Sequence, residues 1–162
     1  MIKVLQELKK FSDDILSLNA PVAVEDIRIL EEKFNLKLPV DYKEIMKVHN
    51  GFSLLGNEVF GVFNEEIASS LGGAYVYEHS HSLSQMPEYL VPFSPDGAGD
   101  FYCFDVRVHR NKSCPVLFWQ NGYEYTPHDQ PEKTNETFTE WLKEVLIEWT
   151  LNDYNYDGTP KF

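Results

Sequence analysis

The sequence predicts an α+β domain in which helices pack around one mostly antiparallel sheet. Apolar residues recur at three- and four-residue spacings in the first third of the chain and near its end, which is the period of amphipathic helices. Between them lie short apolar runs separated by turn residues, as in antiparallel sheets. Because 162 residues suit one hydrophobic core, we expect a single domain over 1–162.

Three helices are expected before residue 51. The first follows the apolar positions from Val4 to Ile15. The second covers 24–34 and has two acidic residues in its first turn, where the helix dipole favours anions. The third begins after Leu38-Pro39, because proline is tolerated in a first helical turn. It ends at Asn50-Gly51, where glycine suits the left-handed conformation that follows a C-cap.

Strands are expected in the middle of the chain. Apolar runs at 58–63, 89–93, 101–108 and 116–120 predict four of them. The dipeptide Asn121-Gly122 is a strong signal for a tight hairpin, which would lead into a strand over 123–126. Segment 67–86 is ambiguous, because Gly72-Gly73 interrupts it and a helix over 74–83 is possible.

The last helix is marked at its start and along its face. Thr137 followed by Glu140 fits a capping box. Its apolar face contains Phe138, Trp141, Leu142, Val145, Leu146 and Trp149. We expect this helix to pack on the sheet. The segment 152–162 is rich in Asn, Asp, Gly and Pro, and we expect it to be a loosely held tail.

The chain is strongly acidic, with 26 acidic and 14 basic residues and a net charge of −12. Such a field repels nucleic acid and anionic membrane surfaces and favours encounter with a basic protein. Solubility alone is a simpler explanation of the charge. The N-terminus has no secretory signal pattern and no apolar run approaches about 18 residues. We therefore expect a cytoplasmic protein of unknown oligomeric state.

Three ordered groups of residues carry a resemblance to a known family. The first is a helix containing Ile27, Leu30, Glu31 and Phe34, followed by Leu38-Pro39, Asp41-Tyr42 and Asn50-Gly51. The second runs from Gly99 through Asp105 and continues in the apolar run Pro115 to Trp119. The third is the helix with Phe138, Trp141 and Leu142. In this order they resemble the SUKH superfamily, which includes fungal Smi/Knr cell-wall-synthesis regulators and many bacterial immunity proteins.

The resemblance implies an α+β fold and a function in protein binding. Bacterial members generally bind a cognate polymorphic toxin domain, often a nuclease or deaminase, and block it. The residues matched for the fold would be structural, namely Pro39, Tyr42, Asn50, Gly51, Gly99, Asp105, Trp119 and Trp141. Toxin-contacting residues vary between members. We therefore expect an immunity protein that occludes a basic toxin without chemistry, and the alternative is a regulatory or scaffold module like the fungal members.

No catalytic or metal site is expected, and no cofactor. The loop 94–100 has glycines and carboxylates but lacks calcium- or phosphate-loop spacing. His79 and His81 have no third ligand at suitable spacing. Cys103 and Cys114 lie in apolar surroundings typical of buried, reduced thiols. A small hydrolytic or metal-dependent enzyme is the least favoured class.

Candidate partner-binding residues come from charge and from aromatic character. Glu136, Glu140, Glu144 and Glu148 recur every fourth residue along the last helix. Like charges at this spacing cost an isolated helix roughly 0.2–0.5 kcal/mol per pair, which suggests a partner, although a solvated ridge is the simpler reading. Asp100, Tyr123 and Tyr125 lie near the expected hairpin, and exposed aromatic residues commonly anchor interfaces.

Overall fold

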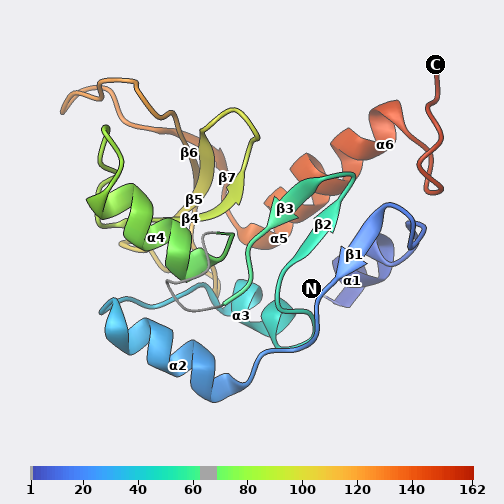
Figure 1. Ribbon diagram of the computed structural model, residues 1–162, viewed down its shortest axis with the longest axis horizontal. Coiled ribbons are helices and arrows are strands. Elements are labelled where there is room, and N and C mark those ends of the chain that lie inside the picture. Colours follow the sequence, from blue (N-terminus) through green and yellow to red (C-terminus); the bar gives the residue numbers. More distant parts are fainter. Residues whose placement is uncertain (1, 63–68) are drawn as a thin grey trace.

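The computed structural model describes residues 2–62 and 69–162 and shows an α+β fold (Figure 1). This confirms the predicted class. The helices are α1 (Ile2–Leu8), α2 (Val24–Lys33), α3 (Val40–Met46), α4 (Leu71–Ser80), and a final run of α5 (Phe138–Trp141), the π-helix η1 (Leu142–Glu148) and α6 (Trp149–Asp153). Phe63 and Ile67, which the sequence assigned to a strand and to the ambiguous segment, lie outside the described residues.

The strands form two antiparallel sheets in place of the single sheet that we predicted. The three-stranded sheet has the order β1-β2-β3, with β1 (Leu16–Leu18), β2 (Phe52–Leu54) and β3 (Asn57–Val59). The four-stranded sheet has the order β4-β5-β6-β7, with β4 (Leu90–Pro95), β5 (Phe101–Asp105), β6 (Val116–Trp119) and β7 (Glu132–Asn135).

The two sheets meet where β3 passes β4. The amide of Phe60 donates to the carbonyl of Phe93 at 2.8 Å, and the Ser94 hydroxyl donates to the Glu58 carbonyl at 2.6 Å. These bonds satisfy backbone groups at the junction without a regular ladder. The apolar pattern of 58–63 therefore predicted buried extended chain, but it could not show that regular pairing stops at Val59.

The predicted first helix is too long. α1 ends at Leu8, and the apolar residues that follow turn into β1, which pairs with β2. Local bonds within the turn explain the break, because the Ser12 hydroxyl accepts from the Asp14 amide at 3.3 Å. The amide of Ser12 donates to the carbonyl of Tyr156 at 2.8 Å. A tertiary partner thus replaces the helical bond that the periodicity suggested.

The glycine pair that we expected to break a helix lies inside α4. Ser70 caps this helix, since its hydroxyl accepts from the Gly73 amide at 3.0 Å. Gly72 and Gly73 are both buried, and α4 packs against β4. The cap and the packing outweigh the poor helix propensity of glycine, which is about 1 kcal/mol per residue.

The predicted tight hairpin is wrong. β6 pairs with β7, and residues 120–131 form the loop between them. Gly122 does adopt a left-handed conformation, with φ of 82°. However, Tyr125 folds back and stacks on Trp119, with ring centroids 4.7 Å apart. Residues 123–126 thus contact β6 through a side chain and not through a backbone ladder, and β6 pairs with β7 after the loop.

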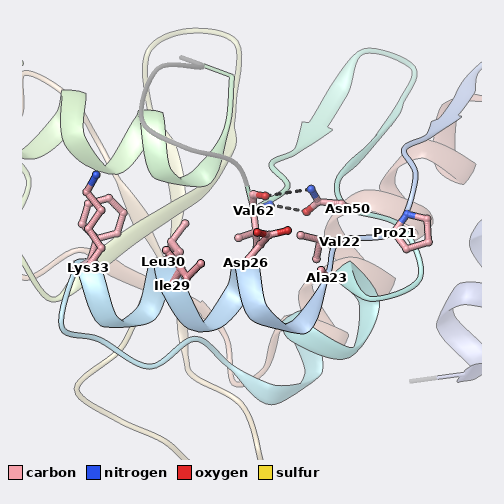
Figure 2. Close-up of a pocket in the computed structure, with 10 residues that line it drawn as sticks. Pro21, Val22, Ala23, Asp26, Ile29, Leu30, Lys33, Asn50 and Val62 are labelled. Carbon is pink, nitrogen blue, oxygen red and sulfur yellow. Dashed lines mark hydrogen bonds between the residues drawn. The ribbon is translucent and has the colours of Figure 1, made fainter.

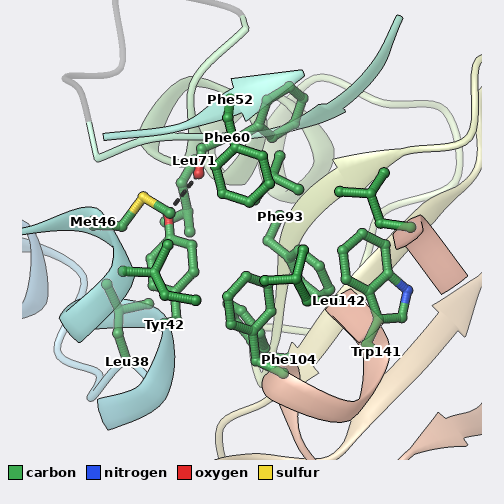
Figure 3. Close-up of a cluster of buried hydrophobic side chains, with 14 of the residues drawn as sticks. Leu38, Tyr42, Met46, Phe52, Phe60, Leu71, Phe93, Phe104, Trp141 and Leu142 are labelled. Carbon is green, nitrogen blue, oxygen red and sulfur yellow. Dashed lines mark hydrogen bonds between the residues drawn. The ribbon is translucent and has the colours of Figure 1, made fainter. Parts of the chain in front are cut away.

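The main hydrophobic core lies on one face of the four-stranded sheet. Tyr42 of α3 is fully buried there and contacts Phe104 and Phe138 edge-on, at centroid distances of 5.2 and 5.4 Å (Figure 3). The Tyr42 hydroxyl donates to the Phe60 carbonyl at 2.6 Å. The opposite face carries a smaller cluster of Met86, Leu90, Cys103, Leu117 and Trp119. Both faces of this sheet are therefore covered.

The start of the final helix confirms half of the predicted capping box. The Thr137 hydroxyl accepts from the Glu140 amide at 3.0 Å. The Glu140 carboxylate, however, accepts from the Glu136 amide at 3.1 Å, one residue before the expected Thr137. Both bonds satisfy amides at the helix start that have no intrahelical acceptor.

The predicted apolar face of the last helix holds as far as Leu146 and fails at Trp149. Trp141 is 1% exposed, whereas Trp149 is 58% exposed. The π-helix between them explains this outcome, because i→i+5 hydrogen bonds widen the turn and delay the return of the chain to the buried face. Thr150 occupies the buried position instead.

The segment 152–162, which we expected to be loosely held, folds back beside α1 (Figure 1). The Tyr156 ring lies 4.9 Å from that of Phe11, and its hydroxyl donates to Glu7. Gly158, with φ of 84°, sits so close to Ile15 that a Cβ atom would lie 2.7 Å from the Ile15 methyl carbon. The looseness of this tail in solution stays a prediction.

Replacement of Trp141 by alanine tests the placement of the final helix. Trp141 is buried and packs edge-on against Phe93 at 4.8 Å. The variant should lose about 3–5 kcal/mol of unfolding free energy, measured by urea denaturation. The matched control is Trp149→Ala, which removes an exposed indole and should cost less than about 1 kcal/mol. Equal losses in the two variants would contradict the described helix face.

Candidate functional site

The predicted partner-binding residues fall on two separate parts of the surface. Asp100, Tyr123 and Tyr125 gather at the end of the four-stranded sheet where β5 begins and β6 ends. The glutamates from Glu136 to Glu148 follow the final helix, which runs toward the opposite side of the molecule (Figure 1). The structure therefore does not join them into one site.

The loop 120–131 is fixed by a few polar contacts. Asp100 accepts a hydrogen bond from the Asn121 amide at 2.8 Å, and the Gln120 amide donates to the Tyr125 hydroxyl at 3.0 Å. Tyr123 is 46% exposed and donates to Asp129, whose carboxylate raises the pKa of Tyr123. Trp119, by contrast, is buried beneath Tyr125. The loop thus presents Tyr123 to solvent on an ordered support.

The four glutamates of the final helix, which we call the acidic ridge, are all exposed. Two of them are paired, Glu136 with Lys133 and Glu148 with Lys143. Glu144 accepts from the Asn135 amide nitrogen at 2.8 Å. Among the described residues, Glu140 and Glu144 form no ion pair. The uncompensated charge of the ridge is therefore concentrated at its centre.

Other residues that the sequence singled out are placed in turns or in the interior. The loop 94–100 is a turn into β5, in which Asp96 accepts from the amides of Ala98 and Asp100 at 2.8 and 2.9 Å. His79 is partly buried, with its ring nitrogens 2.6 and 2.9 Å from the carbonyls of Tyr75 and Pro87. Within residues 2–62 and 69–162, no group of three His, Cys, Asp or Glu side chains could hold a metal ion.

The sequence did not predict the proximity of Cys114 and His109. The two residues are five positions apart, on opposite sides of a turn. The Cys114 thiol lies 3.5 Å from Nδ1 of His109, which is within reach for a nucleophile and its base. Burial, with a smaller contribution from the nearby carboxylates of Asp41 and Asp105, raises the pKa of Cys114 to about 12. Reactive cysteines have lowered pKa values and are partly exposed, so this geometry favours an inert thiol.

A hollow of about 420 Å³ lies along α2 (Figure 2). Its wall includes Ile29 and Leu30 from the helix and Asp26 at its rim. Asn50 closes one side, since its side chain donates to the Val62 carbonyl at 3.1 Å and accepts from the Val62 amide at 2.6 Å. This two-bond contact mimics strand pairing and locks the chain that follows β3.

The residues that carry the family resemblance serve the interior. Gly51 has a φ of 84°, and a Cβ atom there would lie 2.6 Å from the Gly61 nitrogen, so only glycine fits. Pro39 precedes α3 as its N-cap. Gly99 takes a φ of 104° in the turn before β5. Asp105 ends β5 and binds Arg107 at 2.8 and 2.9 Å.

Asp41 connects two helices that are distant in sequence. Its carboxylate accepts from the Ser113 hydroxyl at 2.8 Å, and from the amide and hydroxyl of Thr139 at 3.0 and 3.1 Å. The Ser113 hydroxyl in turn accepts from the Phe138 amide at 3.1 Å. The amides of Phe138 and Thr139 are therefore satisfied from outside the helix, while Thr137 satisfies that of Glu140.

A comparison with protein families identifies this arrangement. The SUKH_6 family, described as SMI1-KNR4 cell-wall, matches residues 24–142. The chain belongs to the SUKH superfamily. The match begins at α2 and ends at the first residue of the π-helix, so it includes Asp41, Ser113 and Thr139. This bears out the predicted family.

A solved structure shares the fold. A crystal structure of a protein from Pseudomonas syringae pv. tomato superposes with a TM-score of 0.60 over 91% of this chain and 99% of that one, at 16% identity. This likeness concerns the fold alone. No curated protein matches the chain significantly. In the described part of the chain, no helix is long and apolar enough to cross a membrane.

Glu31, a residue of the first family motif, should make stability depend on pH. It is 5% exposed, and its carboxylate accepts from the Leu38 amide at 2.8 Å and from Lys43 at 2.9 Å. Burial alone would raise the pKa of Glu31, but the bonds from Lys43 and Leu38 hold it below 4.5. A lowered pKa means that the ionised carboxylate stabilises the fold above pH 4.5 and loses this effect as the pH falls.

The variant Glu31→Gln should lose about 1–3 kcal/mol of unfolding free energy at pH 7. The difference from the parent protein should shrink as the pH is lowered below about 4.5, which urea denaturation between pH 7 and pH 3 would measure. The control is Glu32→Gln, an exposed neighbour that binds Arg28. A loss for Glu31→Gln that stayed constant with pH would contradict the assigned role of the charge.

Proposed function

We propose that this protein is an immunity protein that binds a basic toxin domain and blocks it by covering its active site. The observation that carries the proposal is membership of the SUKH superfamily, which supports an immunity or SMI1-KNR4-like role. The charge of −12 adds to it, because an acidic surface can occupy a groove built for phosphates. The protein would act in the cytoplasm and without chemistry.

The ridge supports a contact by charge. Glu140 and Glu144 lie exposed at the centre of the acidic ridge, and within the described chain neither forms an ion pair. Repulsion along one helix is tolerated by the fold, and a basic partner would relieve it. The loop of Asp100, Tyr123 and Tyr125 is a second candidate contact, since Tyr123 is exposed on a rigid support.

The toxin itself provides the direct test. We expect the neighbouring gene to encode a large secreted protein with a variable C-terminal toxin domain. The purified toxin domain should form a stable complex with this protein and lose its activity at a one-to-one ratio. A toxin that kept full activity in excess immunity protein would refute the proposal.

Charge reversal in the ridge tests its part in binding. The double variant Glu140→Lys/Glu144→Lys should bind the toxin about tenfold more weakly, and the affinity should depend less on salt concentration. Unfolding free energy should fall by about 1–2 kcal/mol, because Glu140 accepts from the Glu136 amide and Glu144 from the Asn135 side chain, so binding is compared where circular dichroism shows both proteins folded. The double variant Asp13→Lys/Asp14→Lys alters net charge equally at an exposed turn and serves as the control. Equal affinities of the two double variants would exclude the ridge.

A second function is favoured by the description of the matching family, SMI1-KNR4 cell-wall. In this alternative the protein is a regulatory or scaffold module that binds a cellular partner in cell-wall physiology. The two functions predict different binding partners in a pull-down experiment. A housekeeping protein captured repeatedly from the native cytoplasm, with no toxin domain encoded nearby, would favour the regulatory module.

A further inference from the structure

A groove separates the final helix from the turn between β4 and β5. It has a volume of about 370 Å³. The residues that matter for its chemistry are Asp96, Tyr102, Trp141, Val145, Trp149 and Asp153. We call it the Trp149 groove. Its size falls at the lower end of small-molecule sites, which span roughly 300–1,000 Å³, and suits one long side chain.

The helical wall of the groove lies next to the acidic ridge. The helical wall contains residues at every fourth position, namely Trp141, Val145, Trp149 and Asp153. The first three each follow a ridge glutamate directly in the sequence, and Asp153 continues the series by one more step. On a helix such a series forms the neighbouring stripe. The π-helical turns expose Trp149 on this stripe, and π-helical insertions are frequent at functional sites. The ridge and the groove therefore occupy adjacent rows of the same helix, although no ridge glutamate lines the groove.

The groove is negative and aromatic. Asp96 and Asp153 are its charged residues, and its lining contains no lysine, arginine or histidine. Asp96 is held by the amides of Ala98 and Asp100, so its position is fixed before any ligand arrives. Burial raises the pKa of Tyr102, and Asp96 and Glu132 raise it further. The negative field thus reaches the aromatic wall.

The groove wall also contains a buried donor without a partner. Trp141 is 1% exposed, and within the described chain its indole nitrogen has no hydrogen-bond acceptor. Figure 3 shows this nitrogen on the side of the ring away from Tyr42 and Phe104. A buried N–H group normally finds an acceptor. Because this nitrogen is itself buried, a ligand in the groove changes its surroundings without reaching it directly.

We propose that the Trp149 groove binds an arginine side chain of the partner protein, with the guanidinium stacked on Trp149 and paired with Asp96 and Asp153. Arginine fits this lining better than lysine, because its planar group both stacks on aromatic rings and pairs with carboxylates. That the partner is a toxin domain rests on the proposed function. The binding of an arginine side chain in the groove is argued from the lining residues alone.

A titration with a minimal probe tests the groove independently of any toxin. The probe is the acetylated and amidated tripeptide Gly-Arg-Gly, followed by the indole N–H signals in nitrogen-15 NMR spectra. The chain has three tryptophans, which Trp149→Phe and Trp119→Phe assign. The signals of Trp141 and Trp149 should shift and saturate, while that of buried Trp119 stays in place. The corresponding lysine peptide should bind more weakly.

Matched charge variants decide whether the carboxylates take part. Asp96→Asn/Asp153→Asn should weaken binding of the arginine peptide about tenfold, whereas Asp13→Asn/Asp14→Asn, which removes two exposed carboxylates from the turn after α1, should leave it unchanged. If both variants weakened peptide binding equally, the effect would come from the net charge of the protein and not from the groove, and the proposal would be overturned. Shifts that never saturate, or that appear first at Trp119, would overturn it as well.

The toxin complex separates this inference from the proposed function. Trp149→Ala should bind the toxin about tenfold more weakly, and Ile29→Ala, which removes an equally exposed apolar side chain on α2, should not. Unchanged toxin affinity in Trp149→Ala would refute the groove and leave the immunity function standing. Absence of any toxin, with the peptide still mapping to Trp149, would refute the immunity function and leave the groove standing.

Discussion

The fold depends on the Asp41 carboxylate, which holds the start of the final helix against α3. It accepts hydrogen bonds from Ser113 and from the amide of Thr139, so one side chain from the first third of the chain satisfies the N-terminus of the last helix. Beside it, the ring of Tyr42 contacts Phe138, and the two links place α3 and α5 on the same face of the four-stranded sheet. The residues matched by the family run from α2 to the end of α5, which is the segment that this contact closes.

The final helix is fixed at its start but becomes π-helical farther on. This change in helix type determines which of its side chains are exposed. Seven residues in the π-helical conformation leave Trp149 exposed and Thr150 buried. The acidic ridge and the Trp149 groove consequently lie side by side. The family match ends at residue 142, so the surface that we propose for binding lies partly within it, at Asp96 and Trp141, and partly beyond it, at Trp149 and Asp153.

The described residues include a close thiol and imidazole pair in the interior and carboxylates and aromatic rings on the surface. The Cys114 and His109 pair is close enough for chemistry, yet burial raises the pKa of the thiol and so keeps it protonated. The exposed surface instead offers carboxylates without cations at Glu140 and Glu144, and aromatic residues at Tyr123 and Trp149. Carboxylates and aromatic rings are the groups that recognise arginine and lysine on a basic partner.

The sequence by itself determined the α+β class, the family, and the helices and strands that have strong local signals. The cap at Thr137 is an example, because its cause lies within a few residues. The third helix, in contrast, ends at Met46 and not at Asn50-Gly51 as we predicted, and the left-handed Gly51 is required by the close approach of Gly61. Tertiary contacts decided the rest. β6 pairs with β7 and contacts the intervening loop through the ring of Tyr125, and β2 pairs with residues 16–18 in a strand. The sequence also named the candidate binding residues, but it could not show how they are arranged. Only the folded chain shows that the ridge borders a groove and that Tyr123 lies on another part of the surface. Periodicity reports which residues share a face of a regular helix; it cannot report a π-helical turn, which depends on how that helix packs.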